Sequence, residues 1–483
     1  MKRVAVIGGG FGGLTAAAEL AAAGHQVTIF EQARALGGKA QVVREGGFTF
    51  DTGPTLLTLP HVVRDVFERI GQAHLLPRLH RLPLHTRYAW RDGQRFECSD
   101  SLEDTIASAA RFGEGDAYRR FAADAERTWQ AAGEPYLEAP FEGFPDFLKR
   151  VMRRGASKLV DGMQLSTLDA WAARHFRSPQ LRQFVGRFAT YVGASPYEAT
   201  GALAMIPHLE RAYGVHHVEG GMAALVSAFE RALQALGVTV RCGERARWER
   251  VRGELRCGPV GHEERFDALV INADPLGEEK PGSKPLAMSG YVLLLDVRAE
   301  HGLELAHHHV AFGGDYRTEF GELFSGRPPS DPTVYFCHPA ATDRTVAPAG
   351  RAGVFVMANA PAFTSAREEA AWSEWAPRLR EQCLDALRAA VPGLLRSDVR
   401  VVAERTPVDL AQLGAPGGSI YGFLPHGRLA AFQRPRQRSS TPGVFYAGGS
   451  VHPGGGVPMV MRSGHFAAQY ARSLLERGGK VAA

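Results

Sequence analysis

Short apolar runs and one alanine-rich segment alternate over the first thirty residues. The first apolar run ends at Ile7, and the second, from Gln26 to Phe30, follows the alanine-rich segment Leu14 to Ala23. Short apolar runs of this kind are typical of strands buried on both faces, whereas the alanine-rich segment has the composition of a helix. Six residues, five of them glycine, join the first strand to this helix. The pattern predicts a strand, a helix and a second, parallel strand.

The same reading extends along the rest of the chain. A hairpin is expected from Thr86 to Cys98 around an Asp92-Gly93 turn, and helices from Ser101 to about Tyr191. The further expected elements are, in chain order, the helix Met222 to Leu236, the strands Gly237 to Val240, Phe266 to Ile271, Tyr291 to Asp296, Thr333 to Cys337 and Val354 to Ala360, the helix Ala366 to Ala390, the strand Val444 to Ala447 and a helix from Met459 into Ala468. At 483 residues the chain is too long for one compact core, so at least two domains are expected.

The glycine-rich turn after the first strand has the spacing of a dinucleotide-binding loop. Gly8 and Gly10 permit a tight turn and a close approach to a pyrophosphate, while Gly13 lets the helix pack on the sheet. The helix N-terminus then directs its N–H groups at the phosphates. Glu31 follows Gly13 by eighteen residues, at the end of the second strand, where a carboxylate can accept hydrogen bonds from the ribose hydroxyls. Together these features predict a bound dinucleotide.

Two further glycine-containing segments favour FAD over a nicotinamide dinucleotide. Gly37-Gly38-Lys39 offers a cation to the pyrophosphate, and Gly53-Pro54 lets the chain pass close to the flavin end of the cofactor. Near the C-terminus, the glycine-rich run from Gly448 to Gly456 leads into the helix expected at Met459, with Pro458 in its first turn. The N-terminus of that helix would favour the negative charge of a reduced flavin.

Composition narrows the class of protein. Hydrophobic residues make up 45% of the chain and charged residues 22%, and the apolar stretches fall short of the roughly 18 residues that span a bilayer. The five cysteines are far apart, which indicates a reducing, cytoplasmic compartment without disulfides or a zinc motif. The net charge of +5 is slight, and no nucleic-acid motif accompanies it. The His307-His308-His309 cluster lacks a recognisable metal-ligand spacing, so no metal site is expected.

The chain resembles the bacterial carotenoid desaturases, flavoproteins related to phytoene desaturase. The resemblance is carried by the N-terminal motif through Pro54, Tyr191 to Pro196, Val218 to Met222, Asn272-Ala273-Asp274, Arg405-Thr406-Pro407 and the His452-Pro453-Gly454 run. Ser450 stands where the wider superfamily often has an acid beside the ribityl chain, which argues against an amine oxidase. The runs Gly448 to Met459 and Gly427 to Pro435 look most like the hydroxycarotenoid 3,4-desaturases. Phytoene desaturases, diapocarotenoid oxidases or ketolases of the same fold, and a non-catalytic lipid-binding escort protein stay open as alternatives.

The resemblance implies a fold, a domain plan and a cofactor site. The fold is α/β: a Rossmann-type FAD-binding domain with an inserted mixed α+β substrate domain and a helical, membrane-facing region. Its expected segments are FAD-binding parts at 1–100, 206–285 and 401–483, a helical region at 101–205 and a β-rich substrate domain at 286–400. The expected cofactor-binding residues are Gly8, Gly10, Gly13, Glu31, Gly38, Lys39, Pro54, Thr55, Leu56, Ala246, Asn272, Asp274, Gly449, Ser450, Val457 and Met459.

Desaturation removes a hydride and a proton from adjacent carbons, and oxidised flavin takes the hydride. Because a polyene delocalises positive charge, no protein base is required, and no catalytic residue is assigned. Glu219, Glu404 and Asp409 lie in or near family motifs, but each is expected to be a structural hydrogen-bonding group. Only one dinucleotide fingerprint is present, so the electron acceptor is expected to be oxygen or a membrane quinone rather than a nicotinamide.

A carotenoid dissolves only in lipid, so peripheral attachment to the inner face of the cell membrane is expected. The candidate contact is an amphipathic helix with Phe144, Phe147, Leu148, Val151 and Met152 on one face. Its basic neighbours are Lys149, Arg150, Arg153, Arg154 and Lys158. Packing of this helix on its own domain is an equally supported alternative.

Overall fold

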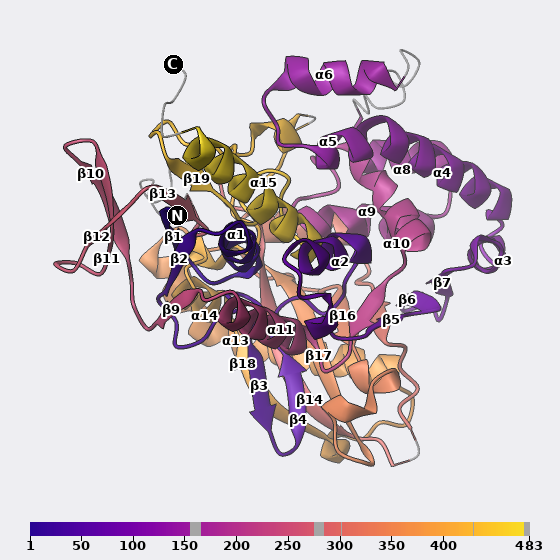
Figure 1. Ribbon diagram of the computed structural model, residues 1–483. Helices are drawn as coiled ribbons and strands as arrows, with labels where there is room; N and C mark the ends of the chain where they lie inside the picture. Colours follow the sequence, from indigo (N-terminus) through magenta and orange to yellow (C-terminus); the bar gives the residue numbers. More distant parts are fainter. Residues whose placement is uncertain (155–165, 275–284, 301, 428, 478–483) are drawn as a thin grey trace.

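The computed structural model describes residues 1–154, 166–274, 285–300, 302–427 and 429–477. A five-stranded parallel sheet forms one end of the molecule, in the strand order β19-β13-β1-β2-β9. Its strands are β1 (Arg3–Ile7), β2 (Gln26–Glu31), β9 (Thr239–Cys242), β13 (Ala268–Ile271) and β19 (Val444–Tyr446). One sheet is therefore assembled from distant parts of the sequence, as Figure 1 shows.

Two layers cover this parallel sheet. On one face, α1 (Phe11–Ala22), α2 (Pro60–Arg69), α11 (Met222–Ala235) and α15 (Val457–Glu476) share a hydrophobic core with the strands. On the other face lies a small antiparallel sheet of β10 (Arg247–Val251), β11 (Glu254–Gly258) and β12 (Glu264–Phe266). Because both faces are covered, the β1 residues Val4, Ala5 and Val6 are fully buried, as the continuous apolar run predicts. The layered α/β arrangement confirms the expected fold class.

Two predicted helices begin earlier than expected. Helix α1 starts at Phe11 rather than Leu14, and α15 starts at Val457 rather than Met459. Both starts fall next to glycines, and glycine is a poor helix former, so the sequence predicts a loop at these positions. In α1, Gly12 and Gly13 are retained inside the helix because close packing leaves no room for a side chain there.

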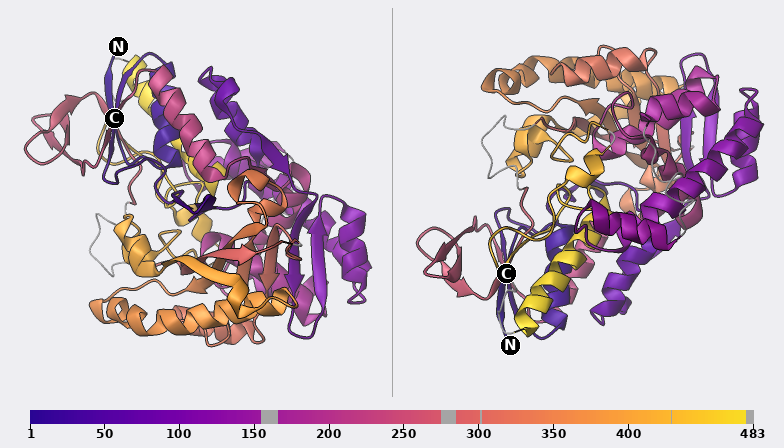
Figure 2. Two further views of the ribbon diagram at one scale, coloured as in Figure 1. Left: turned by 90° about the horizontal axis from the view of Figure 1, so that it is seen from below. Right: turned by 90° about the horizontal axis from the view of Figure 1, so that it is seen from above.

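A second sheet of seven strands runs in the order β18-β14-β17-β16-β15-β6-β7. Its strands are β6 (Leu84–Ala89), β7 (Arg95–Ser99), β14 (Ser289–Arg298), β15 (His308–Ala311), β16 (Val334–Cys337), β17 (Arg351–Ala360) and β18 (Val399–Arg405). The long helix α13 (Ala366–Ala390) packs on its outer face (Figure 2). The predicted hairpin β6–β7 joins this sheet through a parallel pairing of β6 with β15, so the N-terminal hundred residues contribute to both sheets.

A helical layer completes the molecule and packs around an aromatic core. Its helices are α3 (Leu102–Ala110), α4 (Gly115–Thr128), α5 (Glu134–Glu138), α6 (Phe144–Arg153), α8 (Leu168–His175), α9 (Pro179–Gly186) and α10 (Ile206–Tyr213). The remaining regular elements are β3 (Val42–Glu45), β4 (Phe48–Asp51), β5 (Leu79–Arg81), β8 (His216–Val218), α12 (Tyr316–Phe324) and α14 (Pro407–Gln412). Within the described residues, no helix combines the length and apolar character needed to cross a bilayer.

Candidate functional site

A large cavity is lined by residues of the parallel sheet, the seven-stranded sheet and the helical layer. Its volume is about 1060 Å³. Of the sixteen residues predicted to bind the cofactor, fifteen line this cavity, although they come from six separated segments of the chain. The exception is Gly13, which lies behind the loop: a Cβ there would come within 2.1 Å of the Gly8 carbonyl oxygen. Gly13 therefore allows helix α1 to pack closely against the loop after β1, in agreement with the role expected from its position in the glycine motif.

Neighbouring residues fix the conformation of the glycine loop that follows β1. Gly8 has a φ of +98°, a conformation that strains any other residue. The Asn272 side-chain amide donates to the Gly8 carbonyl oxygen at 3.2 Å, which ties the loop after β13 to the loop after β1. A Cβ on Gly12 would meet the Asn272 Oδ1 at 2.5 Å. Small residues and one amide thus keep the backbone available to a phosphate group.

Glu31 lies at the end of β2 with both carboxylate oxygens oriented by backbone groups. Oε2 accepts a hydrogen bond from Gly9 N at 2.6 Å, and Oε1 accepts one from Ala33 N at 2.7 Å. Each oxygen of a carboxylate has a second lone pair. The side chain is buried but lines the cavity, so it can still accept from ribose hydroxyls while it shapes the glycine loop.

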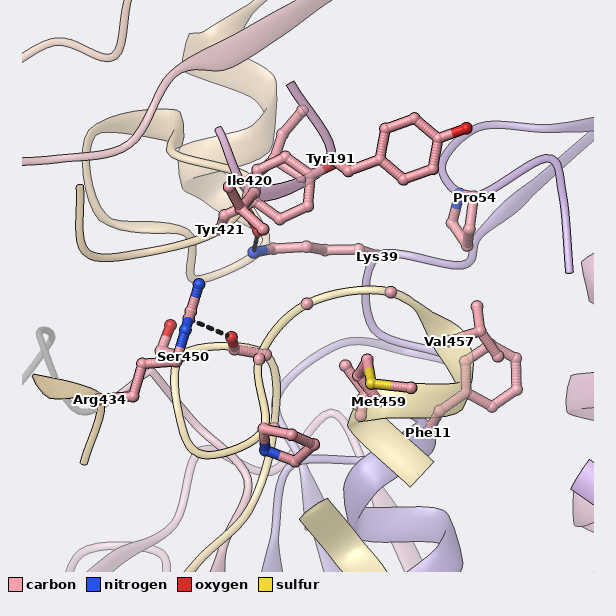
Figure 3. A pocket seen from close by; sticks show the side chains of 18 of the residues that line it. Phe11, Lys39, Pro54, Tyr191, Ile420, Tyr421, Arg434, Ser450, Val457 and Met459 are labelled. Carbon is pink, nitrogen blue, oxygen red and sulfur yellow. Dashed lines mark hydrogen bonds between the residues drawn. The ribbon is translucent and has the colours of Figure 1, made fainter. Parts of the chain in front are cut away.

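Lys39 spans the cavity rather than pointing into open space. Its Nζ donates to the Ile420 carbonyl oxygen at 2.6 Å, as Figure 3 shows, and to the Ser419 carbonyl oxygen at 3.4 Å. Burial lowers the pKa of this amine, and the carboxylate of Asp274 opposes that shift. The cation predicted for the pyrophosphate thus also fixes the loop at residues 419–421.

The C-terminal glycine run forms the opposite wall. Ser450 Oγ donates to Asp274 Oδ2 at 2.6 Å, and Arg434 Nη1 donates to the Gly449 carbonyl oxygen at 3.0 Å. Helix α15 begins at Val457 with Pro458 in its first turn, and Val457 and Met459 line the cavity. Figure 3 shows Val457 and Met459 across the cavity from Pro54 and Lys39. A flat ring between the walls would meet the helix N-terminus along one edge.

Several lining residues were not predicted from the sequence. Arg434 is buried, and Tyr191 and Tyr421 face the cavity (Figure 3). Tyr191 Oη donates to Glu210 Oε1 at 2.6 Å and accepts from Arg187 Nη1 at 3.3 Å. Tyr191 and Arg434 lie in segments that carried the family resemblance, so motif membership was the available signal. Arg187 carries no such signal, because its position depends on packing against Tyr88 and Tyr191.

Apolar side chains of the helical layer and of the segment 429–432 line one part of the cavity. Phe144, Leu148 and Val151 of α6 line it, together with Leu429 and Phe432. Phe144 is 41% exposed and Leu429 is 50% exposed. The predicted amphipathic helix α6 therefore has a buried side and an exposed side. Phe147 and Val151 pack on the protein, while Phe144 and Met152 are exposed. Lys158, part of the same prediction, lies outside the described residues.

The other candidate carboxylates lie away from the cavity in structural hydrogen bonds. Glu219 bonds His80 at 2.9 Å, Glu404 accepts from Tyr291 and pairs with Arg380, and Asp409 caps α14 by accepting from Thr406 N at 2.7 Å. None of the three lines the cavity as far as the chain is described.

His452 and the pair His307 and His308 are buried, and none of the three is among the described residues that line the cavity. His452 packs against Tyr136, with a ring separation of 4.5 Å, and burial lowers its pKa to about 3. His307 and His308 lie beside Cys337, with one potential ligand atom from each within 4.8 Å of the others. The pairing of β15 with β16 creates this proximity, which no spacing within the sequence could indicate.

Comparison with known proteins gives matches over nearly the whole chain. Residues 11–472 match the family described as flavin containing amine oxidoreductase. The chain is 37% identical to the hydroxyneurosporene desaturase of Cereibacter sphaeroides, with 97% of each chain covered. It is 35% identical to the hydroxyneurosporene desaturase of Rhodobacter capsulatus, covering 96% of this chain and 97% of that one. The lycopene-forming phytoene desaturase of Pseudescherichia vulneris is 31% identical, with 96% and 97% covered.

Solved structures share the fold at much lower identity. An oxidoreductase from Methanosarcina mazei superposes with a TM-score of 0.63 at 16% identity, covering 98% of this chain and 100% of that one. This likeness concerns the arrangement of the elements alone.

Proposed function

Because the chain belongs to the flavin-containing amine oxidoreductase family, and within it to the carotenoid desaturases, we propose that it introduces the C3,4 double bond into an acyclic carotenoid hydroxylated at C1. The enzyme is an FAD-dependent oxidoreductase. The observation that carries the proposal is one cavity that is lined by the glycine loop after β1, by the start of α15 and by the exposed apolar side chains of Phe144 and Leu429. In this proposal a polyene reaches the flavin from lipid through this cavity.

The residues present fit FAD. Gly8 and Gly10 leave backbone exposed to a pyrophosphate at the start of α1, and Glu31 is oriented for a ribose. Lys39 supplies a buried positive charge, and the start of α15 supplies a positive dipole end beside Val457. Val457 and Met459 offer an apolar edge for a flat ring system. The acids that line the described cavity are Glu31, Glu244 and Asp274.

The chain's contribution to the reaction is binding and orientation of the cofactor and the substrate. Bound FAD supplies a hydride acceptor. Each lining acid belongs to a segment of the FAD-binding domain, and Asp274 is engaged by Ser450. The lining that these segments do not supply is largely apolar, which suits a polyene whose conjugated chain stabilises the positive charge left by hydride loss. We therefore assign no catalytic base: the hydride passes to the flavin, and the proton is released to solvent.

Membrane attachment and the electron acceptor belong to the same proposal. The exposed Phe144 and Met152 lie on α6 beside the exposed Lys149 and Arg153, and Phe144 also lines the cavity. A helix of this kind binds an anionic lipid surface. Such a surface on the cytoplasmic side would deliver substrate and also a quinone. Oxygen is the alternative acceptor.

Substrate feeding tests the reaction. Phytoene, lycopene and 1-hydroxylated lycopene derivatives are supplied separately to pigment-free cells that express only this chain, with an empty-vector host as control. The expected product comes from the hydroxylated substrate, has two hydrogens fewer and absorbs at longer wavelength. Conversion of phytoene to lycopene, with no action on hydroxylated substrates, would assign the chain to the phytoene desaturases. Gain of oxygen with aldehyde formation would assign it to the carotenoid oxidases.

A further inference from the structure

One charged side chain interrupts the largely apolar part of the cavity wall. The helical layer and the β-rich segment contribute apolar residues such as Leu203 and Met288 to the lining. Among the described lining residues of 101–205 and 286–400, Arg187 is the only charged one. A polyene has no group that pairs with a cation, and burying a charge without a partner is costly. A cation in this wall therefore points to a polar group on the ligand.

Arg187 keeps two donor nitrogens free for a ligand in the cavity. Its Nη1 donates to Tyr88 Oη and to Tyr191 Oη, each at 3.3 Å. Nε and Nη2 have no hydrogen-bond partner among the described residues, and neither atom is fully buried. The residue is 7% exposed and lines the cavity, so these N–H groups are within reach of a ligand there. Because Nε and Nη2 share one edge of a planar group, a single oxygen can accept from both.

Aromatic rings hold the guanidinium group in place. Its central carbon lies 5.2 Å from the centre of the Tyr191 ring, 5.5 Å from that of Tyr88 and 5.9 Å from that of Phe188. At these distances the rings attract the cation. A side chain that is already fixed loses little conformational freedom when a ligand binds, so its hydrogen bonds contribute more to affinity.

Glu210 balances the charge of Arg187 without occupying the free edge. Tyr191 Oη accepts from Arg187 Nη1 and donates to Glu210 Oε1 at 2.6 Å, so the phenol joins the two charges. Glu210 is 2% exposed. The buried network is neutral as a whole, and a ligand carboxylate would add an unbalanced negative charge to it. The free edge of Arg187 therefore suits a neutral acceptor oxygen, such as that of a hydroxyl group.

The network lies opposite the place expected for the flavin ring. Tyr191 lines the cavity with Arg187, and Figure 3 shows Tyr191 across from Val457 and Met459 at the start of α15. In a 1-hydroxylated carotenoid, only one methylene separates the hydroxyl-bearing carbon from C3. A hydroxyl held by Arg187 would therefore keep C3 and C4 in the part of the cavity that faces α15.

We propose that Arg187 is the anchor for the tertiary hydroxyl of the substrate. Nε and Nη2 donate to the hydroxyl oxygen, while Tyr88, Tyr191 and Glu210 are positioning residues that hold the guanidinium group. This inference rests on the proposed function and names the substrate group that the site selects. An analogue without the hydroxyl leaves two N–H groups of a buried cation unpaired, so the site disfavours it.

Binding to the reduced holoenzyme tests the anchor. Lycopene and 1-hydroxylated lycopene, in the same detergent micelles, are titrated anaerobically into dithionite-reduced protein, and quenching of the tryptophan fluorescence gives each Kd. Wild-type protein is expected to bind the hydroxylated carotenoid about 10- to 100-fold more tightly than lycopene. Equal Kd values for the two carotenoids would overturn the proposal.

Two variants assign that preference to Arg187. Arg187→Lys keeps the positive charge but loses the planar edge. The double variant Arg187→Met with Glu210→Gln removes both charges together, so that no unpaired charge stays buried. Each should bring the ratio of the two Kd values close to one, with little change in the Kd of lycopene, the FAD content or the melting temperature. An unchanged ratio, or an equal loss for both carotenoids, would overturn the proposal.

Arg182→Lys is the matched control for these variants. Arg182 lies in the same helical layer and donates from Nε to the Phe176 carbonyl oxygen at 2.7 Å, but it is not among the described lining residues. This variant should keep the wild-type preference. Because a reduced flavin accepts no hydride, the Kd values do not depend on which bond the enzyme oxidises. A failed feeding experiment with an intact preference would therefore overturn the proposed reaction and not the anchor.

Discussion

Gly12 of α1 and Gly464 of α15 lie in direct backbone contact: a Cβ on Gly464 would stand 2.1 Å from the Gly12 carbonyl oxygen. The two helices come from opposite ends of the sequence, and each begins at a loop that lines the cavity. Their contact therefore sets the separation of the two walls between which the cofactor binds. The glycine at position 464 has no role visible in the sequence motifs, but it fixes the geometry of the site.

Gly464→Ala is expected to destabilise the protein strongly, by about 3 kcal/mol or more, because the clash is with backbone atoms that cannot rotate away. It should also reduce the FAD content by separating the two loops. Gly321→Ala is the matched control, since Gly321 is also within a helix and a Cβ there meets no atom within 4 Å. Thermal unfolding of both variants measures the difference. Similar melting temperatures for the two would contradict the proposed role of the contact.

Glu31→Ala and Glu31→Gln should both weaken FAD binding about 10- to 100-fold. The alanine variant removes the acceptors for Gly9 N and Ala33 N, and the glutamine variant places an amide donor against one of these N–H groups. Flavin retained after gel filtration, and the Kd from flavin fluorescence, measure the loss. Glu374→Gln on the exposed side of α13 is the control. Full flavin retention in both Glu31 variants would rule out a role for this carboxylate.

Buried histidines predict a loss of stability on acidification. Burial lowers the pKa of His308, His309 and His452 from 6.5 to about 3. Between these values the unfolded chain binds protons that the folded protein does not, so the free energy of unfolding falls as the pH falls below 6.5. Each histidine should contribute about 1 kcal/mol of that loss between pH 7.5 and 5.5.

His309→Leu isolates one of these contributions. Neither ring nitrogen of His309 has a hydrogen-bond partner in the described structure, so the apolar replacement removes the titrating group without breaking a bond. Melting temperatures of the variant should fall less between pH 7.5 and 5.5 than those of the wild-type protein. The exposed His74→Gln serves as the control. An unchanged pH dependence in His309→Leu would show that this histidine is not the source.

The motifs that the sequence revealed are those made by residues close together in the chain. Gly8, Gly10 and Glu31 belong to one strand-helix-strand unit, so their spacing alone predicts their proximity. Glu319, Thr333 and Asn359 are brought together only by the pairing of β16 with β17 and the packing of α12, which depend on tertiary structure. The same reason explains why the β6–β7 hairpin was recognised but its place in the seven-stranded sheet was not.

Charge reversal on α6 should weaken binding to anionic membranes. The sequence pattern places Arg150 among the basic residues that contact lipid, but its guanidinium donates to the carbonyl oxygens of Pro135, Ala139 and Pro140 and is largely buried. Arg154 pairs with Glu134. Reversal at either position would disturb the fold, so the informative variant is the double change Lys149→Glu with Arg153→Glu, at two exposed positions of the helix.

Each basic residue near an anionic surface contributes about 1 kcal/mol to binding, so this double variant should bind vesicles that contain phosphatidylserine at least about 10-fold more weakly. Arg367→Glu with Arg378→Glu makes the same charge change on exposed positions of α13 and should leave binding unchanged. Met152→Ser tests the apolar part of the contact, because this apolar side chain is 53% exposed on α6. Liposome flotation with neutral and anionic vesicles measures all three. Equal flotation of the two double variants would exclude α6 as the membrane contact, and loss of flotation in the α13 variant alone would move the contact to the outer face of the seven-stranded sheet.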